Sequence, residues 1–213
     1  IHIDVAEGDA GTVDFGFGYS NYEKFSGFID LGYKNLFGMN RQASLKIAYN
    51  SLEKIYALNY SDPWIFGSQL QFRAAAYREE REEKNIDTKV IMYRYRKHGF
   101  SAGIEKQYTS TIKIGISYDY VLADTFDVQP DMILTDQDSG KLGIGSLTPS
   151  ITYDTGDNPF DPSKGILAGV SVKVASPALL SETSFVKAVF NSSLYQELSR
   201  YFVFAVAVRA GVA

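Results

Sequence analysis

The chain has 213 residues, with 21 basic and 25 acidic side chains, a formal net charge of −4 and no cysteine. The lack of cysteine excludes disulfide frameworks and thiolate metal sites. The acidic balance argues against a nucleic-acid partner, because nucleic-acid-binding proteins carry a basic patch or stripe. No apolar run approaches the roughly 20 residues that a membrane-spanning helix needs.

The dominant pattern along the chain has a period of two. Residues 12–20 alternate apolar with small or charged side chains, and residues 42–50 and 111–120 do the same. Weaker copies of this pattern occupy residues 24–34, 54–61, 68–78, 88–107, 144–154, 166–175, 184–197 and 201–209. Successive side chains of a strand point to opposite faces, so each segment predicts a strand with one apolar face. The sequence therefore predicts about eleven strands.

The connections between these segments alternate in character. One set is rich in Pro, Gly, Asn and Asp, the residues that favour tight turns, and comprises residues 35–38, 62–67, 107–110, 157–165 and 198–200. The other set is longer and more polar, and includes residues 78–87 and 124–143. The charge run at residues 79–84 predicts a solvated loop or an extended hairpin tip rather than a short helix. Tight turns on one side and longer loops on the other are typical of an up-and-down membrane barrel.

A soluble β-sandwich also alternates apolar and polar residues and stays an alternative. Two further features favour an antiparallel transmembrane β-barrel. Aromatic residues gather near the strand ends on the apolar face: Tyr19, Tyr33, Tyr49, Tyr60, Tyr118 and Tyr120. The opposite face is rich in glycine and charge, as suits contact with water: Asp14, Asp30, Lys46, Arg73, Arg94, Lys113, Asp119 and Lys173.

Few residues suggest a catalytic or metal-binding site. Four oxygen-bearing side chains at Asp154, Asp157, Asn158 and Asp161 could bind calcium, but their spacing is that of an ordinary turn rather than of a calcium loop. The two histidines, His2 and His98, have no partners at metal-ligand spacing, and no nucleophile motif is present. We therefore expect no enzyme activity, no metal and no cofactor.

A basic group offers two interpretations. It consists of Arg94, Arg96, Lys97 and Lys106. These side chains could contact lipopolysaccharide phosphates or line the polar face. Alternatively, they belong to a solvated hairpin and pair with the acidic run Glu79, Glu80, Glu82 and Glu83.

At several places the pattern resembles a known family, the BamA/TamA family of outer-membrane assembly proteins. Residues 146–165 closely resemble the strand–turn–strand at the middle of those barrels. Residues 11–20 and 27–38, and Asp62-Pro-Trp followed by Phe66-Gly67, are similar to the first hairpin and the next periplasmic turn. Residues 1–8 resemble the last strand of the periplasmic repeat domain. One departure is Gly156, where family members often carry Arg.

The resemblance implies a partial barrel, with about eleven of an expected sixteen strands. It divides the chain into the end of a periplasmic repeat domain with its linker (1–10) and the N-terminal part of the barrel (11–213). The rest of the barrel is expected to lie outside this chain. Membership implies an integral protein of the outer membrane of a diderm bacterium. Its expected partners are nascent β-barrel substrates, outer-membrane lipid, lipopolysaccharide and periplasmic accessory proteins.

The resemblance also implies two sets of site residues. The first barrel strand would form a lateral seam at which substrate barrels are templated, with residues Val13, Asp14, Phe15, Gly16, Phe17, Gly18 and Tyr19. The mid-barrel turn would be built by Asp154, Asp157, Asn158, Pro159, Asp161, Pro162 and Gly165. Two alternative functions stay open: a transport pore of the two-partner secretion type, and the membrane anchor of a surface enzyme.

Overall fold

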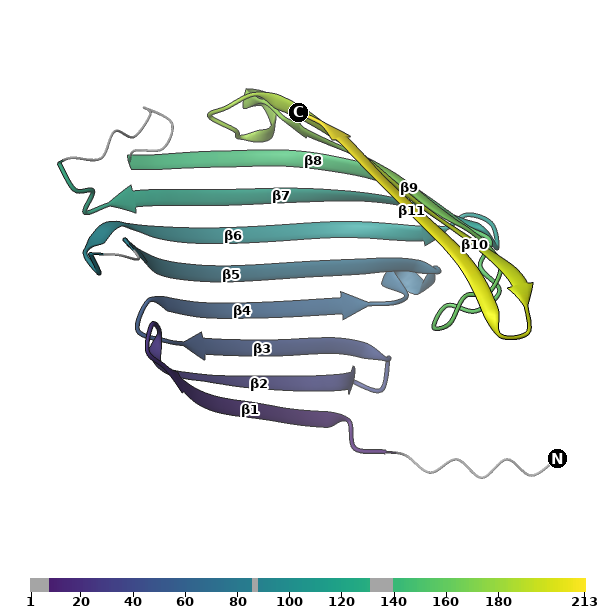
Figure 1. The fold of residues 1–213 in the computed structure, drawn as a ribbon, viewed down its shortest axis with the longest axis horizontal. Coiled ribbons are helices and arrows are strands. Elements are labelled where there is room, and N and C mark those ends of the chain that lie inside the picture. The colour runs from purple at the N-terminus through teal and green to yellow at the C-terminus, as the bar shows by residue number, and fades with distance from the viewer. Residues whose placement is uncertain (1–7, 86–87, 131–139) are drawn as a thin grey trace. The chain divides into compact units, whose positions relative to one another are not determined.

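Eleven strands follow one another in a single antiparallel sheet, in the order β1 to β11 (Figure 1). The computed structural model describes residues 8–85, 88–130 and 140–213. The strands are β1 (Gly11–Ser20), β2 (Lys24–Leu36), β3 (Arg41–Tyr49), β4 (Glu53–Asp62), β5 (Leu70–Lys84), β6 (Ile91–Gln107), β7 (Ile112–Phe126), β8 (Gly140–Asp154), β9 (Gly165–Ala175), β10 (Phe185–Ser199) and β11 (Phe202–Val212). Two short 3-10 turns, η1 (Ile65–Gly67) and η2 (Pro177–Leu179), lie in the connections. Over the described residues, we find no helix of the length and apolarity needed to cross a membrane.

The predicted antiparallel all-β fold is confirmed, because each of the eleven predicted segments overlaps one strand. Three strands run further than the sequence predicts. The charge run at 79–84 continues β5, so it forms the side of an extended hairpin rather than a loop. Likewise, β7 runs on to Phe126 and β8 begins at Gly140, inside the stretch predicted as a long loop. The interpretation of residues 1–8 as a periplasmic strand lies outside the described residues, apart from Gly8.

Contacts divide the chain into two units. Unit 1 comprises Ile1–Pro63, Arg73–Phe100 and Leu122–Leu142, and unit 2 comprises Trp64–Phe72, Ser101–Val121 and Gly143–Ala213. Within unit 1 the register of β1 to β4 brings like side chains into rows. One apolar row is formed by Val13, Leu31, Leu45 and Leu58, and the next by Phe15, Ile29, Ile47 and Tyr56. On the other face, Asp14, Asp30 and Lys46 form a charged row.

The strands of unit 2 show the same separation of faces. One apolar row crosses β8 to β11 through Ile151, Val170, Phe190 and Ala210. On the opposite face Lys173 lies directly across from Lys187. Like charges at directly opposed positions destabilise a sheet, and only the high dielectric constant of water makes their repulsion small. In each unit, the polar face is therefore one that suits contact with water.

The apolar rows are exposed rather than packed against another layer. Among the described residues, the buried apolar side chains are Leu52 and Ala175 alone. Phe17 on β1 is 89% exposed, and Leu58 on β4 is 54% exposed. A sandwich would bury its apolar rows between two sheets. The sandwich alternative is therefore contradicted, and the apolar rows lie exposed on one face of a single sheet.

Candidate functional site

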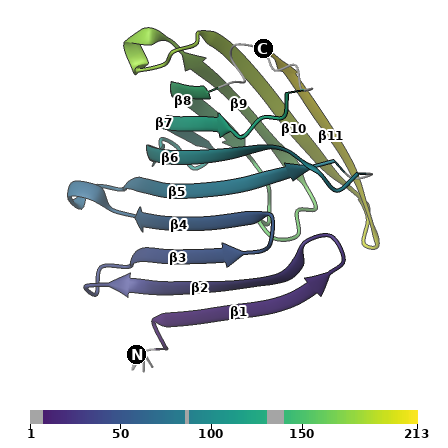
Figure 2. The same cartoon turned by 90° about the vertical axis from the view of Figure 1, so that its left-hand side faces the viewer.

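The candidate seam is the strand at the start of the sheet. β1 pairs with β2 along ten consecutive residues, from Gly11 opposite Tyr33 to Ser20 opposite Lys24. In the part of the chain that the structure describes, β2 is the only strand neighbour of β1. Figures 1 and 2 show β1 at the end of the strand series. We call the side of β1 that faces away from β2 its open edge.

One hydrogen bond fixes which backbone groups point to the open edge. The N–H of Lys34 donates to the carbonyl oxygen of Ala10 at 2.7 Å, so these two residues form a hydrogen-bonded pair. Such pairs recur at every second position of an antiparallel ladder. Even-numbered residues of β1, including Asp14 and Gly16, therefore bond to β2. The odd-numbered residues direct their N–H and C=O groups to the open edge: Val13, Phe15, Phe17 and Tyr19.

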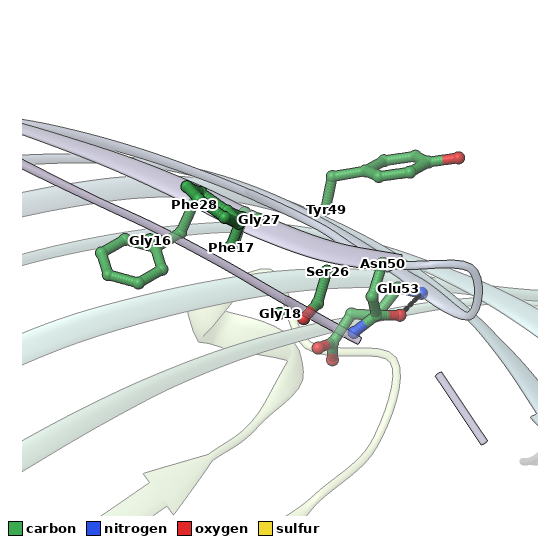
Figure 3. A pocket seen from close by; sticks show the side chains of 10 residues that line it. Gly16, Phe17, Gly18, Ser26, Gly27, Phe28, Tyr49, Asn50 and Glu53 are labelled. Atoms are coloured by element: carbon green, nitrogen blue, oxygen red, sulfur yellow. Dashed lines mark hydrogen bonds between the residues drawn. The ribbon is translucent and has the colours of Figure 1, made fainter. Parts of the chain in front are cut away.

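Side chains of β2 cover part of the polar face of β1, where β1 itself has glycines. Gly16 lies under the ring of Phe28 on β2, so close that a Cβ atom at Gly16 would lie 2.5 Å from a carbon of that ring. Gly18 faces the hydroxyl of Ser26. A depression of about 380 Å³ opens beside these residues and reaches Glu53. In Figure 3, Tyr49 projects from one side of the strands, and Ser26 and Glu53 lie on the other side.

The mid-barrel turn between β8 and β9 is organised around Asp157. Its carboxylate accepts hydrogen bonds from the backbone N–H groups of Ser163 and Lys164, at 2.9 and 3.0 Å, and from the Ser163 hydroxyl. Its own N–H donates to the Lys164 carbonyl at 3.2 Å. Such bonds pull the two arms of the turn together. The ammonium of Lys164 continues the network to Glu197 on β10, at 2.8 Å.

Two other side chains of the predicted motif serve the same turn. Asp154 accepts the Gly156 N–H at 2.8 Å, and Asn158 accepts the Phe160 N–H at 3.0 Å. These carboxylate and amide oxygens face backbone donors, which is the ordinary chemistry of a turn. In the described residues, we find no group of three or more His, Cys, Asp or Glu side chains placed to hold a metal ion. Asp161 and Pro159 are exposed and Pro162 is half-buried.

The hydrogen bonds from the Ser163 hydroxyl and from the Lys164 and Ser163 N–H groups hold the pKa of Asp157 well below its ordinary value of 3.8. A lowered pKa means that Asp157 stabilises the turn above pH 3.8, and that this contribution is lost as the pH falls further, through the depressed pKa of the folded state. We expect Asp157→Asn to speed amide hydrogen exchange at Ser163 and Lys164 at neutral pH, because the neutral amide is a weaker acceptor. In the wild-type protein, the protection of these two amides from exchange is corrected for the intrinsic exchange rate at each pH. This protection should persist down to about pH 3.8 and decline below it. Asp161→Asn is the control, and equal exchange in both variants would contradict this role.

Two members of the basic group, Arg94 and Arg96, form ion pairs in and beside the extended hairpin of β5 and β6. Arg94 pairs with Glu82 at 3.0 Å and with Asp127 at 2.7 Å, and Arg96 pairs with Glu80 at 2.8 Å. These guanidinium groups are committed to carboxylates of the hairpin and its neighbourhood. They therefore do not favour a lipopolysaccharide site. His98 lies exposed on β6.

One feature of unit 2 has no counterpart in the sequence patterns. The connection between β9 and β10 folds back onto β7 and β8. The Tyr118 hydroxyl donates to the Leu179 carbonyl at 3.0 Å, and Glu182 bonds through both its N–H and its carboxylate to Gly143. A Cβ atom at Gly145 would lie 1.7 Å from the Leu179 carbonyl oxygen. Tyr118, predicted as part of an aromatic girdle, is therefore hydrogen-bonded to this connection.

The exposed apolar rows, the charged opposite face and the tight turns together define a class: a sheet from an outer-membrane β-barrel. The model of the Omp85 superfamily domain matches residues 35–213. The chain belongs to the Omp85 superfamily, whose members are outer-membrane β-barrel proteins that insert or secrete other proteins. This agrees with the family that the sequence resembles.

A comparison with curated proteins finds no match. Among solved structures, the chain is similar to the crystal structure of BamA from Haemophilus ducreyi lacking POTRA domains 1–3, with a TM-score of 0.69 and 17% sequence identity. The match covers 96% of this chain and 41% of that one. The chain therefore spans less than half of the matched protein, and at this identity the likeness establishes the fold.

Proposed function

We propose that this chain is the N-terminal part of the barrel of an outer-membrane assembly factor, which receives the terminal strand of a substrate barrel along β1. The observation that carries the proposal is the open edge, where Val13, Phe15, Phe17 and Tyr19 direct their backbone groups away from β2. Each unsatisfied backbone group costs several kcal/mol in hydrocarbon. A strand that pairs with this edge removes that cost and gains a template.

The proposal requires no bound cofactor and no catalytic step. The free energy of insertion comes from the folding of the substrate barrel itself. At Gly16 and Gly18, β1 presents no side chain on its polar face, where the Phe28 ring and the Ser26 hydroxyl of β2 lie instead. The partners are then nascent outer-membrane barrels and the lipid of that membrane, with periplasmic accessory proteins delivering the substrate.

A disulfide crosslinking experiment tests the seam directly. This chain contains no cysteine, so once any cysteine outside it is replaced by serine, single cysteines can be placed in the full-length protein at Phe15 or Phe17. A further cysteine is placed in the terminal strand of a substrate barrel. We expect crosslinks from these positions during assembly. Ile47 is the matched control: it lies on the same apolar face, but β3 is paired on both sides. Crosslinks that are absent from β1, or equally strong from Ile47, would contradict the proposal.

Depletion of the full-length protein distinguishes this function from two-partner secretion. An assembly factor serves many clients, so its depletion should lower the amounts of many outer-membrane proteins together. Loss of one exported protein, with the other barrels unaffected, would instead indicate a dedicated transporter.

A further inference from the structure

The polar face of β1 carries a single charged side chain, that of Asp14. The other residues that β1 places on this face are threonine, glycine and serine. Asp14 is exposed, and in the part of the chain that the structure describes its carboxylate forms no ion pair. Asp14 is therefore the charge that a strand arriving at the open edge would meet.

Asp14 belongs to a row of charges that is balanced on one side only. Asp30 lies directly across from it on β2, and Lys46 lies directly across from Asp30 on β3. Opposite charges at facing positions stabilise a sheet, and like charges destabilise it. Lys46 is the direct neighbour of Asp30, but it lies two strands away from Asp14, roughly 10 Å at the ordinary strand spacing. Asp14 thus has a like charge on one side and the open edge on the other.

The hydrogen-bonding pattern of β1 brings an incoming antiparallel strand especially close to Asp14. A residue that bonds to the strand on one side forms a non-hydrogen-bonded pair with the strand on its other side. The Cα atoms of such a pair lie about 4.5 Å apart, against about 5.5 Å in a hydrogen-bonded pair. Asp14 bonds to β2, so its pair with an incoming strand is of the closer kind. The residue that faces it across the open edge would lie nearer to Asp14 than Asp30 does.

We propose that Asp14 selects incoming strands that carry a lysine or arginine on their polar face, at the position directly opposite its carboxylate. A cation there completes the row, because each of the two carboxylates then has a cation as a direct neighbour. A strand with an acidic residue at this position would place a third negative charge beside Asp14 and Asp30. This inference rests on the proposed function, since it concerns the strand that pairs with β1. Asp14 acts as a specificity-determining residue and takes part in no chemical step.

A comparison of two substrate barrels tests this selection. Crosslinks from cysteines at Phe15 and Phe17 fix the register of the incoming strand, and so identify the substrate residue that lies opposite Asp14. Substrates with lysine or glutamate at that residue are then assembled by the full-length protein in proteoliposomes at low salt. We expect the lysine substrate to assemble about fivefold faster, which is the size expected for one exposed pair of charges across two strands.

Asp14→Lys should reverse the preference, so that the glutamate substrate assembles faster. The new lysine lies across from Asp30, so opposite charges face each other and the pairing of β1 with β2 is kept. Asp9→Lys is the matched control, because it makes the same change of charge on an exposed side chain just before β1. It should keep the wild-type preference. Salt at about 1 M, which shortens the Debye length to about 3 Å, should reduce the preference of every variant.

Four results would overturn the proposal. They are a wild-type protein without a preference, an unchanged preference in Asp14→Lys, the same reversal in Asp9→Lys, and a preference that salt leaves undiminished. Equal slowing of both substrates by Asp14→Lys would also overturn it, and would place Asp14 in the stability of the barrel itself. The Phe15 crosslinks separate the two proposals: if they form with both substrates while the assembly rate ignores the charge, only the selection by Asp14 fails.

Discussion

Replacing Phe15 by proline is expected to slow templated assembly more than tenfold while leaving β1 paired with β2. Proline lacks the N–H group, and the N–H of Phe15 points to the open edge, whereas its neighbours Asp14 and Gly16 carry the bonds to β2. The incoming strand would leave one carbonyl unpaired in hydrocarbon, at a cost of several kcal/mol. Since about 1.4 kcal/mol corresponds to a tenfold change, assembly of a labelled substrate barrel in proteoliposomes should slow more than tenfold.

Two variants make this result specific to the edge. Phe15→Leu keeps the N–H group and an apolar side chain, so it should assemble substrate at nearly the wild-type rate. Gly16→Pro removes an N–H group that faces β2, so it should weaken the pairing of β1 with β2. Faster hydrogen exchange of the β2 amides would detect this loss of pairing. Wild-type assembly by Phe15→Pro would contradict the role given to the open edge.

The second large effect is expected at Gly165, in the mid-barrel turn. Its φ of 115° lies in a region that L side chains rarely adopt, and a Cβ atom there would lie 2.4 Å from the Thr155 carbonyl oxygen. The backbone conformation alone costs about 1–3 kcal/mol for a residue other than glycine. The overlap involves backbone atoms, so relief requires the turn to open. Gly165→Ala should therefore lower the free energy of unfolding in urea by roughly 3 kcal/mol.

Gly156→Ala is the matched control in the same turn. A Cβ atom at Gly156 meets a side-chain oxygen of Asp154 at 3.1 Å, which can move, and Gly156 has no positive φ. This variant should unfold within about 1 kcal/mol of the wild type. Equal destabilisation by the two substitutions would mean that the turn does not depend on the special conformation of Gly165.

The strands were predictable because their period-two alternation is long and regular. At β3, for example, Leu45 and Ile47 flank Lys46, and the strand appears where that alternation lies. The full length of the hairpin formed by β5 and β6 was harder to predict from the sequence. Residues 79–84 show charge without an apolar face, so hydrophobic periodicity gave no signal there. The strand continues because Glu80 and Glu82 pair with Arg96 and Arg94 across the hairpin.

Other features depend on which residues become neighbours across strands. The cover of Gly16 by Phe28 follows from the β1–β2 register, which single-strand patterns do not contain. The contact between Leu179 and Gly145 joins segments that lie 34 positions apart in the sequence. For the mid-barrel turn, the sequence indicated which residues take part, but the central role of Asp157 emerged only from its hydrogen bonds.

The apolar face of each strand is expected to contact lipid and the polar face to contact water. Spin labels placed singly at residues 43–49 of β3 in the reconstituted full-length protein measure this by their collision rates with oxygen, which concentrates in lipid, and with a water-soluble nickel complex. We predict that Ala43, Leu45, Ile47 and Tyr49 are accessible to oxygen, and that Ser44, Lys46 and Ala48 are accessible to nickel. If neither reagent reached the odd-numbered positions, those side chains would be buried against protein, and the assignment to a membrane sheet would be contradicted.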